Sequence, residues 1–353
     1  MQTILGLLYH AIGGISSGSF YMPFKKVKGW AWESFWIIGG LFSWLIVPPI
    51  AAYLTVPNFS NIISAADSDV KTFVFTMGLL WGIGGLTYGL GVRYLGMSLG
   101  NSICLGFCSA FGALVPSIYY NFNPATGKIS FTDMLGTSGG RLVLFGVLVC
   151  LIGIAISGKA GMMKEAELNK DEATGEGQVN KKEFSLVKGL IIAVCSGILS
   201  SFFQFGIEGG KPMAAEAVNQ GFNKLFQNNV TYVVLLWGGL TTNFIWCMYL
   251  NFKNKTFRDY TNTETPIASN VLYSGIAGTM WFLQFFFYGM GESKLGNGAS
   301  SWILHMATII LTANFWGLYL KEWSNVSQKT FRTFLLGIGL ILLSIVLVGI
   351  GNA

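Results

Sequence analysis

Apolar residues fill a series of long stretches along this 353-residue chain, and the polar gaps between them are mostly short. Each stretch is close to the roughly 20 residues that an α-helix needs to cross a bilayer. A segment in lipid must satisfy its backbone hydrogen bonds internally, so we expect helices. The pattern predicts ten spans, at residues 3–22, 34–54, 72–91, 97–119, 141–158, 187–208, 230–250, 268–290, 298–319 and 333–350. The predicted fold is an all-α polytopic membrane protein.

Composition supports this fold, because only 11% of the residues are charged, against about a quarter in a soluble domain. One long segment, 158–189, is polar, mixed in charge and glycine-containing, and it has little reason to fold alone. It separates five predicted spans from five others. We therefore expect a first five-helix repeat at 1–158, a linker at 159–186 and a second five-helix repeat at 187–353.

The basic residues predict the orientation of the chain. Of its 22 lysines and arginines, 16 lie in the gaps after the odd-numbered spans. Positive charge concentrates in short cytoplasmic loops. The linker is therefore predicted to be cytoplasmic and both termini to lie outside, and the net charge of +6 needs no nucleic acid to explain it.

Two stretches that lie in opposite halves of the chain resemble each other. The sequence GLLWGIGGLTYGLGVRYLG begins at Gly78 and GTMWFLQFFFYGMGESKLG at Gly278, and seven of 19 positions are identical without a gap. Since each half has an odd number of spans, the two repeats would be inverted. That architecture is typical of secondary transporters, which hold the substrate near the bilayer midplane. Helix packing alone, which favours glycine and aromatic residues, is the alternative explanation.

Two histidines, His10 and His305, are candidates for carrying a proton. Each lies in an apolar run, roughly two helical turns from the predicted outer face. A buried ionisable side chain is costly and is therefore a functional candidate, and histidine can exchange a proton in the physiological pH range. The alternative is a neutral histidine that forms hydrogen bonds between helices.

Two acids have simpler explanations. Glu33 begins the second span and is a third proton-carrying candidate, but we favour an ion pair with the lysines at 25–28 just before it. Glu208 precedes Lys211 by three residues, which predicts an exposed ion pair on one helix.

Aromatic and amide side chains share helix faces within the spans. Trp281, Gln284 and Tyr288 recur at i, i+3 and i+7, so they lie on one face. Rings can cover the C–H faces of a neutral polyhydroxylated ligand while amides bond its hydroxyls. An aromatic packing stripe is the alternative for any single ring, but an unpaired amide in hydrocarbon would cost roughly 4–8 kcal/mol. The other candidates for this site are Trp81, Tyr88, Gln204 and Trp302.

Motifs of catalysis are missing from the sequence. It contains no nucleophile elbow, metalloprotease signature or phosphate loop. The five cysteines lie in apolar spans and do not have the spacing of a metal site or a disulfide framework. We therefore expect no enzyme, cofactor or metal, and an ion gradient as the energy source.

Five motifs in order, FYMPFKKVKGWAWE (20–33), LWGIGGLTYGLGVRYLGMSLG (80–100), MWFLQFFFYGMG (280–291), SWILHM (301–306) and LKEW (320–323), resemble the L-rhamnose–proton symporters. That family belongs to the ten-span drug/metabolite transporter superfamily. The resemblance implies uptake of L-rhamnose, or of L-lyxose or L-mannose, with a proton across a bacterial inner membrane. The candidates that match family motif positions are His10, Glu33, Trp81, Tyr88, Trp281, Gln284, Tyr288, Trp302 and His305.

Two other classes of function remain open at this point. A proton-independent facilitator, or an exporter of another small neutral metabolite, would share the fold and the repeat. A membrane-embedded sensor or sugar-modifying enzyme would need a signalling domain or a catalytic cluster, and the sequence shows neither.

Overall fold

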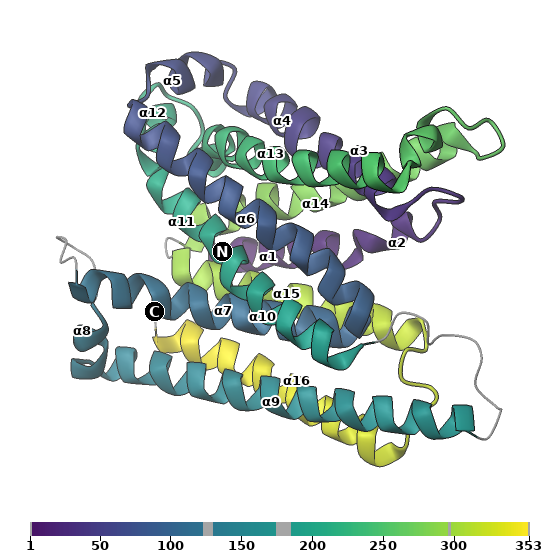
Figure 1. Ribbon diagram of the computed structural model, residues 1–353. Helices are drawn as coiled ribbons and strands as arrows, with labels where there is room; N and C mark the ends of the chain where they lie inside the picture. Colours follow the sequence, from purple (N-terminus) through teal and green to yellow (C-terminus); the bar gives the residue numbers. More distant parts are fainter. Residues whose placement is uncertain (1, 123–129, 174–184, 296–297, 352–353) are drawn as a thin grey trace. The chain divides into compact units, whose positions relative to one another are not determined.

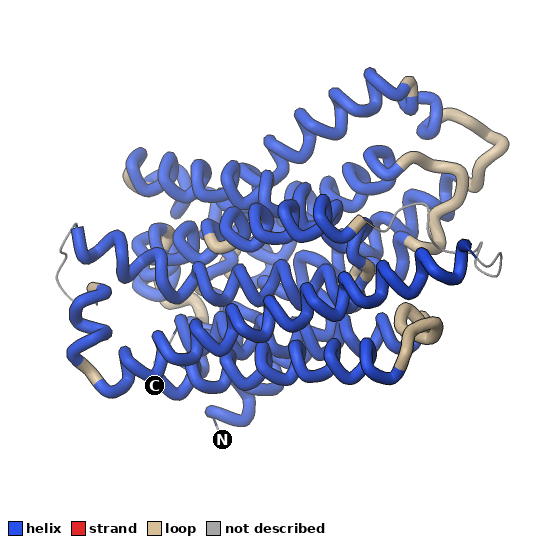
Figure 2. Tube along the Cα trace, turned by 60° about the horizontal axis from the view of Figure 1, so that its bottom comes forward, coloured by secondary structure: helices blue, strands red, loops and turns tan. Residues whose placement is uncertain are grey.

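The computed structural model describes residues 2–122, 130–173, 185–295 and 298–351. Within these ranges the chain forms helices and connecting loops and contains no strand (Figures 1 and 2). The helices are α1 (Gln2–Ser19), α2 (Tyr21–Phe24), α3 (Trp32–Gly40), η1 (Leu41–Ile46), α4 (Val47–Thr55), α5 (Phe59–Ala65), α6 (Ser68–Leu95), α7 (Met97–Phe122), α8 (Phe131–Gly136), α9 (Ser138–Ala173), α10 (Leu186–Ser200), α11 (Phe202–Gly209), α12 (Lys211–Asn219), η2 (Lys224–Phe226), α13 (Asn228–Asn254), η3 (Thr256–Tyr260), α14 (Ile267–Leu295), α15 (Gly298–Tyr319) and α16 (Gln328–Gly351).

Each predicted span coincides with a helix or a run of helices in the described residues. Seven of these have the length and hydropathy needed to cross a membrane: Trp32–Thr55, Ser68–Leu95, Ser138–Glu167, Leu186–Asn219, Lys224–Asn254, Ile267–Leu295 and Gln328–Gly351. The other three predicted spans correspond to α1, α7 and α15. The structure is therefore that of a multi-pass membrane protein.

The first part of the predicted linker is helical, and it is held by contacts with residues outside the linker. Helix α9 continues without a break to Ala173. Its polar end has partners, because the carboxylate of Glu167 accepts hydrogen bonds from the backbone N–H of Ser327 at 2.7 Å and from the hydroxyl of Thr330 at 2.6 Å. Residues 174–184 of the predicted linker lie outside the described residues.

The chain divides into two compact units, and each takes helices from both halves of the sequence. Unit 1 comprises Met1–Gly85 and Phe202–Gly296, and unit 2 comprises Leu86–Ser201 and Asn297–Ala353. The predicted repeats are continuous stretches of sequence, whereas each of these units combines segments from both halves, so the two divisions of the chain differ. Folding of either unit requires contacts between residues far apart in the chain.

In unit 1, α14 packs against α1, α3 and η1, and α13 packs against α3 and α4. Two glycines allow α3 and α14 to approach closely. A Cβ on Gly278 would lie 3.0 Å from the Cα of Gly39 and closer still to its carbonyl oxygen. A larger residue at position 278 would therefore force the two helices apart.

The helical run from α3 to α4 is widened at η1, which is a single π-helical turn. Pro48 and Pro49 follow it, and neither has a backbone N–H to donate to the carbonyls one α-turn earlier. The N–H of Val47 instead donates to the carbonyl oxygen of Phe42, five residues back. A π-turn inserts a residue into the helical repeat, so the side chains before and after it point in directions that a regular α-helix would not give.

In unit 2, α16 packs along α9, while α15 and α10 pack against α7 (Figure 1). Side chains near the end of α9 contact the segment that leads into α16. The ammonium group of Lys164 lies 4.7 Å from the ring centre of Trp323, which itself stacks on Phe334 at 3.8 Å. These contacts explain why the polar end of α9 is ordered.

Candidate functional site

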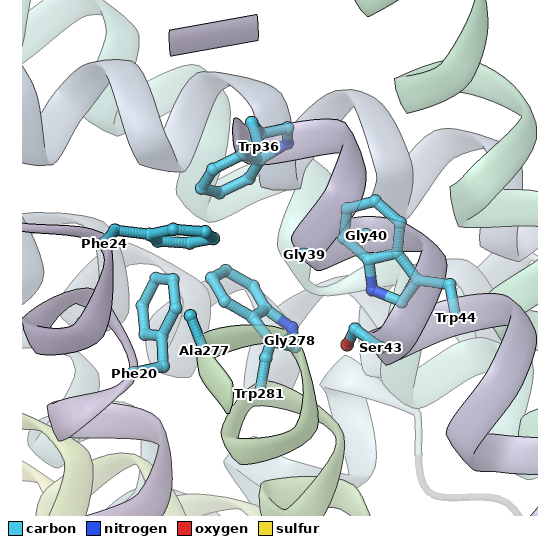
Figure 3. Close-up of a pocket in the computed structure, with 10 residues that line it drawn as sticks. All are labelled: Phe20, Phe24, Trp36, Gly39, Gly40, Ser43, Trp44, Ala277, Gly278 and Trp281. Carbon is cyan, nitrogen blue, oxygen red and sulfur yellow. The ribbon is translucent and has the colours of Figure 1, made fainter. Parts of the chain in front are cut away.

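Unit 1 contains a narrow space with aromatic walls, which we call the aromatic pocket (Figure 3). Its free volume is about 10 Å³, far less than the roughly 300–1,000 Å³ of typical drug-sized sites. Its side chains converge from the α1–η1 segment and from α14. The lining residues are Phe20, Phe24, Trp36, Gly39, Gly40, Ser43, Trp44, Ala277, Gly278 and Trp281.

Trp281 lies at the centre of the pocket's aromatic contacts (Figure 3). Its ring packs edge-to-face against Phe20, with centroids 4.1 Å apart, and against Trp36 at 5.7 Å. Trp36 in turn meets Trp44 at 6.5 Å. Its indole N–H donates to the Asn243 side-chain oxygen at 2.9 Å, which fixes the ring against α13. The walls are therefore packed rings, of which Trp36 is held by a hydrogen bond to a neighbouring helix.

Glycines next to the pocket have no side chain and therefore leave space for its aromatic rings. The Trp44 ring lies over Gly40, where a Cβ would come within 2.8 Å of its Cε3 atom. Gly39 and Gly278 form the close crossing of α3 and α14 that borders the pocket. Ser43 and Trp44 belong to the π-turn η1, so the irregular turn determines where their side chains point.

Two polar atoms that η1 contributes to the lining have no hydrogen-bond partner among the described residues. They are the hydroxyl of Ser43 and the indole N–H of Trp44, on side chains that are only 1% and 2% exposed. An unpaired buried donor costs about 1–3 kcal/mol. A ligand with hydroxyl groups would accept these hydrogen bonds while its C–H faces contact the rings.

The ring wall continues from the pocket to Trp81. Its centroid lies 6.1 Å from that of Trp44 and 4.9 Å from that of Phe203, and Phe203 stacks on Phe285 at 4.1 Å. The structure therefore brings Trp81 and Trp281, two of the predicted residues, to the same aromatic cluster in unit 1. Trp44 is the ring between them.

Three more predicted residues come together beside this cluster. The Tyr288 hydroxyl donates to the Gln204 side-chain oxygen at 3.1 Å, which joins α14 to α11. His10 lies on α1 with its ring 5.6 Å from that of Tyr288, and it is fully buried. The His10 ring also lies against Gly291, where a Cβ would be 2.5 Å from its Nε2 atom.

Gln284 lies on α14 between Trp281 and Tyr288, and it is 5% exposed. Among the described residues it has no hydrogen-bond partner. The amide can therefore bond a polar ligand, and its contact with the sugar stays a prediction.

The remaining predicted residues belong to unit 2. The Tyr88 hydroxyl bonds to Asn101 on α7, and Trp302 on α15 lies beside Gly112, 3.3 Å from where its Cβ would be. Those two positions on α7 are eleven residues apart, about 16 Å along a helix. His305, one turn after Trp302, is 1% exposed.

Glu33 does not pair with the neighbouring lysines, which corrects the favoured interpretation. In the described residues its carboxylate accepts hydrogen bonds from the Asn254 amide and the Thr256 hydroxyl, each at 2.9 Å. It is 5% exposed and its partners are neutral. In contrast, the predicted ion pair of Glu208 and Lys211 is confirmed at 2.6 Å.

Sequence reasoning named Trp281 but missed the pocket residues before it in the chain. The stretch WESFWIIGGLFSW (32–44) carried a signal, because Trp32, Trp36 and Trp44 recur at helical spacing. It gave no reason to choose Ser43, since serine is common in such helices. The π-turn and the crossing with α14, which bring this face to Trp281, were not visible in the pattern.

Comparison with known proteins gives a consistent result over the full chain. Residues 1–353 match the family model described as L-rhamnose-proton symport protein (RhaT). The chain is 38% identical to proteins named L-rhamnose-proton symporter from Yersinia pestis (strain Pestoides F) and Pectobacterium carotovorum subsp. carotovorum (strain PC1), and each alignment covers 99% of this chain and 98% of the relative. The expected resemblance is confirmed, and the chain belongs to the L-rhamnose–proton symport protein family, a family of transporters and not of enzymes.

Proposed function

We propose that this protein imports L-rhamnose together with a proton across a bacterial inner membrane by alternating access. The observation that carries the proposal is the aromatic pocket with its two unpartnered donors, Ser43 and Trp44, in a chain that matches the symporter family from end to end. The relatives named above are L-rhamnose-proton symporters.

The pocket suits a deoxy sugar such as L-rhamnose. Trp281, Trp36 and Phe20 offer ring faces and edges to C–H groups and to the methyl group of the sugar. Ser43 and Trp44 would donate to sugar oxygens. Because the space is small, we expect the rings to turn aside as the sugar enters. L-lyxose and L-mannose are alternative substrates.

The other predicted residues are proposed to contribute to the same transport cycle. Gln284 and the bonded pair Gln204 and Tyr288 lie next to the ring wall of unit 1 and would contact sugar or shape the pocket. Trp81 supports the wall through Trp44. Tyr88 and Trp302 of unit 2 are proposed to contact the sugar at another stage of the cycle.

The proton is proposed to move through buried titratable groups, for which His305, His10 and Glu33 are the candidates. All three are buried. A symported proton must be bound on one side and released on the other, so several groups can be needed in turn. Binding of proton and sugar must favour the same conformational change, and their linkage must be reciprocal.

We further propose ten spans arranged as two inverted repeats, 1–158 and 187–353, with a cytoplasmic linker and external termini. The two matched sequence stretches support this arrangement. Gly78 on α6 meets the backbone of α13 as closely as Gly278 on α14 meets that of α3. Trp81 and Trp281, the matched rings, both contact the aromatic cluster of unit 1.

Purified protein in vesicles tests the proposed function. With an imposed pH gradient, acid outside, radiolabelled L-rhamnose should accumulate, and a pH dye should report proton entry when rhamnose is added. A panel with L-lyxose, L-mannose and D-glucose defines the substrate. Rhamnose uptake that equilibrates equally fast without a gradient and never accumulates would identify a facilitator. If the vesicles take up no rhamnose, the proposed function is refuted.

A further inference from the structure

A buried carboxylate that the sequence analysis did not single out, Glu292, lies near the end of α14. It is 9% exposed, and the Asn228 side-chain amide donates a hydrogen bond to its Oε2 atom at 2.7 Å. In the described part of the chain it forms no ion pair with a lysine, arginine or histidine. An ionised carboxylate is costly to bury without a cation, and protonation removes that cost.

The surroundings of Glu292 join four helices of unit 1. Tyr288 is one turn earlier on α14 and bonds to Gln204 on α11. Asn228 begins α13, and its Cβ lies 3.4 Å from where a Cβ on Gly289 would be. His10 on α1 lies against Gly291, next to Glu292 in sequence. A change of charge at Glu292 would therefore be felt where α1, α11, α13 and α14 meet.

We propose that Glu292 is a proton-binding residue of the transport cycle, with Asn228 as the residue that holds its carboxylate in place. The proposal rests on the proposed function, because it assumes that a proton accompanies the sugar. In the proposed topology α14 ends outside, so Glu292 is about one turn from the external face. The carboxylate takes a proton from a hydronium ion outside, leaving water, and gives it to water on the inner side later in the cycle.

The coupling to sugar follows from the position of Tyr288. Protonation of Glu292 removes a negative charge one helical turn from the Tyr288 hydroxyl, which is bonded to Gln204. Gln204 adjoins Phe203, whose ring contacts Trp81 at 4.9 Å. The neutral form of Glu292 thus changes the field around the bonds that connect α11 and α14 beside the ring wall. Sugar bound at that wall would in turn favour the neutral form.

Other charged or titratable groups surround this end of α14. The ion pair between Glu208 and Lys211 acts on Glu292 electrostatically, with opposing signs from its two members. Near this end of α14 lie Tyr288 and Lys294 on α14, Tyr9 and His10 on α1, Tyr232 on α13 and Lys224 in η2. Tyrosines and lysines keep one charge state near neutral pH.

The test replaces Glu292 by glutamine, which keeps an acceptor for Asn228 and mimics the protonated acid. We expect Glu292→Gln to lose pH-gradient-driven rhamnose accumulation at least tenfold, and to lose the proton signal of the pH dye. Counterflow of labelled against unlabelled rhamnose needs no net proton movement, so it should continue and should no longer vary between pH 5.5 and 8. Glu216→Gln, an exposed acid on α12, is the matched control and should behave as the parent.

A second variant keeps the test informative if Glu292→Gln is poorly folded. Asn228→Ala removes the hydrogen bond that favours the carboxylate, so the pH dependence of rhamnose affinity should move to higher pH. Accumulation and proton entry at parental levels in Glu292→Gln, or an unshifted pH profile in Asn228→Ala, would overturn the inference. Failure of the parent protein to couple rhamnose to protons would instead refute the proposed function on which it rests.

Discussion

The unpartnered hydroxyl of Ser43 predicts an unusual pair of effects for Ser43→Ala. In most buried positions, loss of a hydroxyl removes a hydrogen bond and destabilises the fold. The Ser43 hydroxyl has no partner in the described structure and is 1% exposed. Its removal therefore relieves a desolvation penalty, so the sugar-free protein should be as stable as the parent or more stable, by up to about 1–3 kcal/mol.

The same change should weaken sugar binding. One neutral hydrogen bond contributes about 0.5–1.5 kcal/mol, which corresponds to about a 2- to 13-fold rise in the dissociation constant of L-rhamnose. The rings of the pocket are untouched, so binding weakens without being abolished. Thermal unfolding in detergent without and with rhamnose measures both effects, because the ligand-induced rise in melting temperature depends on affinity.

A control with a paired hydroxyl separates the two effects. Ser344 is equally buried, and its hydroxyl donates to the carbonyl oxygen of Ile341 at 2.6 Å. Ser344→Ala should destabilise the sugar-free protein by about 0.5–1.5 kcal/mol and leave rhamnose affinity unchanged. If Ser43→Ala is destabilised like this control and binds rhamnose as the parent does, the reasoning about the pocket is refuted.

Three further predictions follow from the structure and the sequence. Gln284→Leu should weaken rhamnose binding by about 0.5–1.5 kcal/mol or more while the protein still folds; isothermal titration measures this, and unchanged affinity would remove Gln284 from the site. His305→Gln should abolish gradient-driven accumulation of rhamnose but leave rhamnose exchange. A pH dye in vesicles follows the protons that enter with rhamnose, and continued proton entry in this variant would show that His305 is structural. Gly278→Ala should lower stability by about 1–3 kcal/mol, because its methyl group would clash with the backbone of Gly39. Gly339→Ala, with open space around it, is the control, and equal melting temperatures for the two variants would contradict the packing argument.

The positions of the helices could be predicted from the sequence because lipid imposes a length and a polarity on each segment. The span expected at 230–250 is α13, Asn228–Asn254, and the span expected at 298–319 is α15. Helix α9 is longer than the span expected at 141–158 and continues to Ala173, into the segment whose polarity suggests a linker. Glu167 is satisfied there by Ser327 and Thr330, and these partners are about 160 residues away, beyond any local pattern.

The candidate site was predictable only where a single helix carries it. Trp281, Gln284 and Tyr288 share one face of α14, a property of spacing alone, and all three are buried in the structure. Ser43 and Trp44 join Trp281 through a π-turn and a glycine crossing between helices. Glu292 was overlooked because it stands near a helix end beside Ser293 and Lys294, where an acid is usually solvated.

By itself, the sequence determined that this protein is a bundle of membrane helices, where those helices lie along the chain, and to which family it belongs. These follow from hydropathy, spacing and motifs, which are local properties. Only the tertiary structure decided which buried polar groups have partners. It gave Glu33 and Glu292 neutral partners in place of cations and left Ser43 and Trp44 without any. Whether a buried polar group has a hydrogen-bond partner depends on the distance between segments remote in sequence, and that distance is set only when the helices pack.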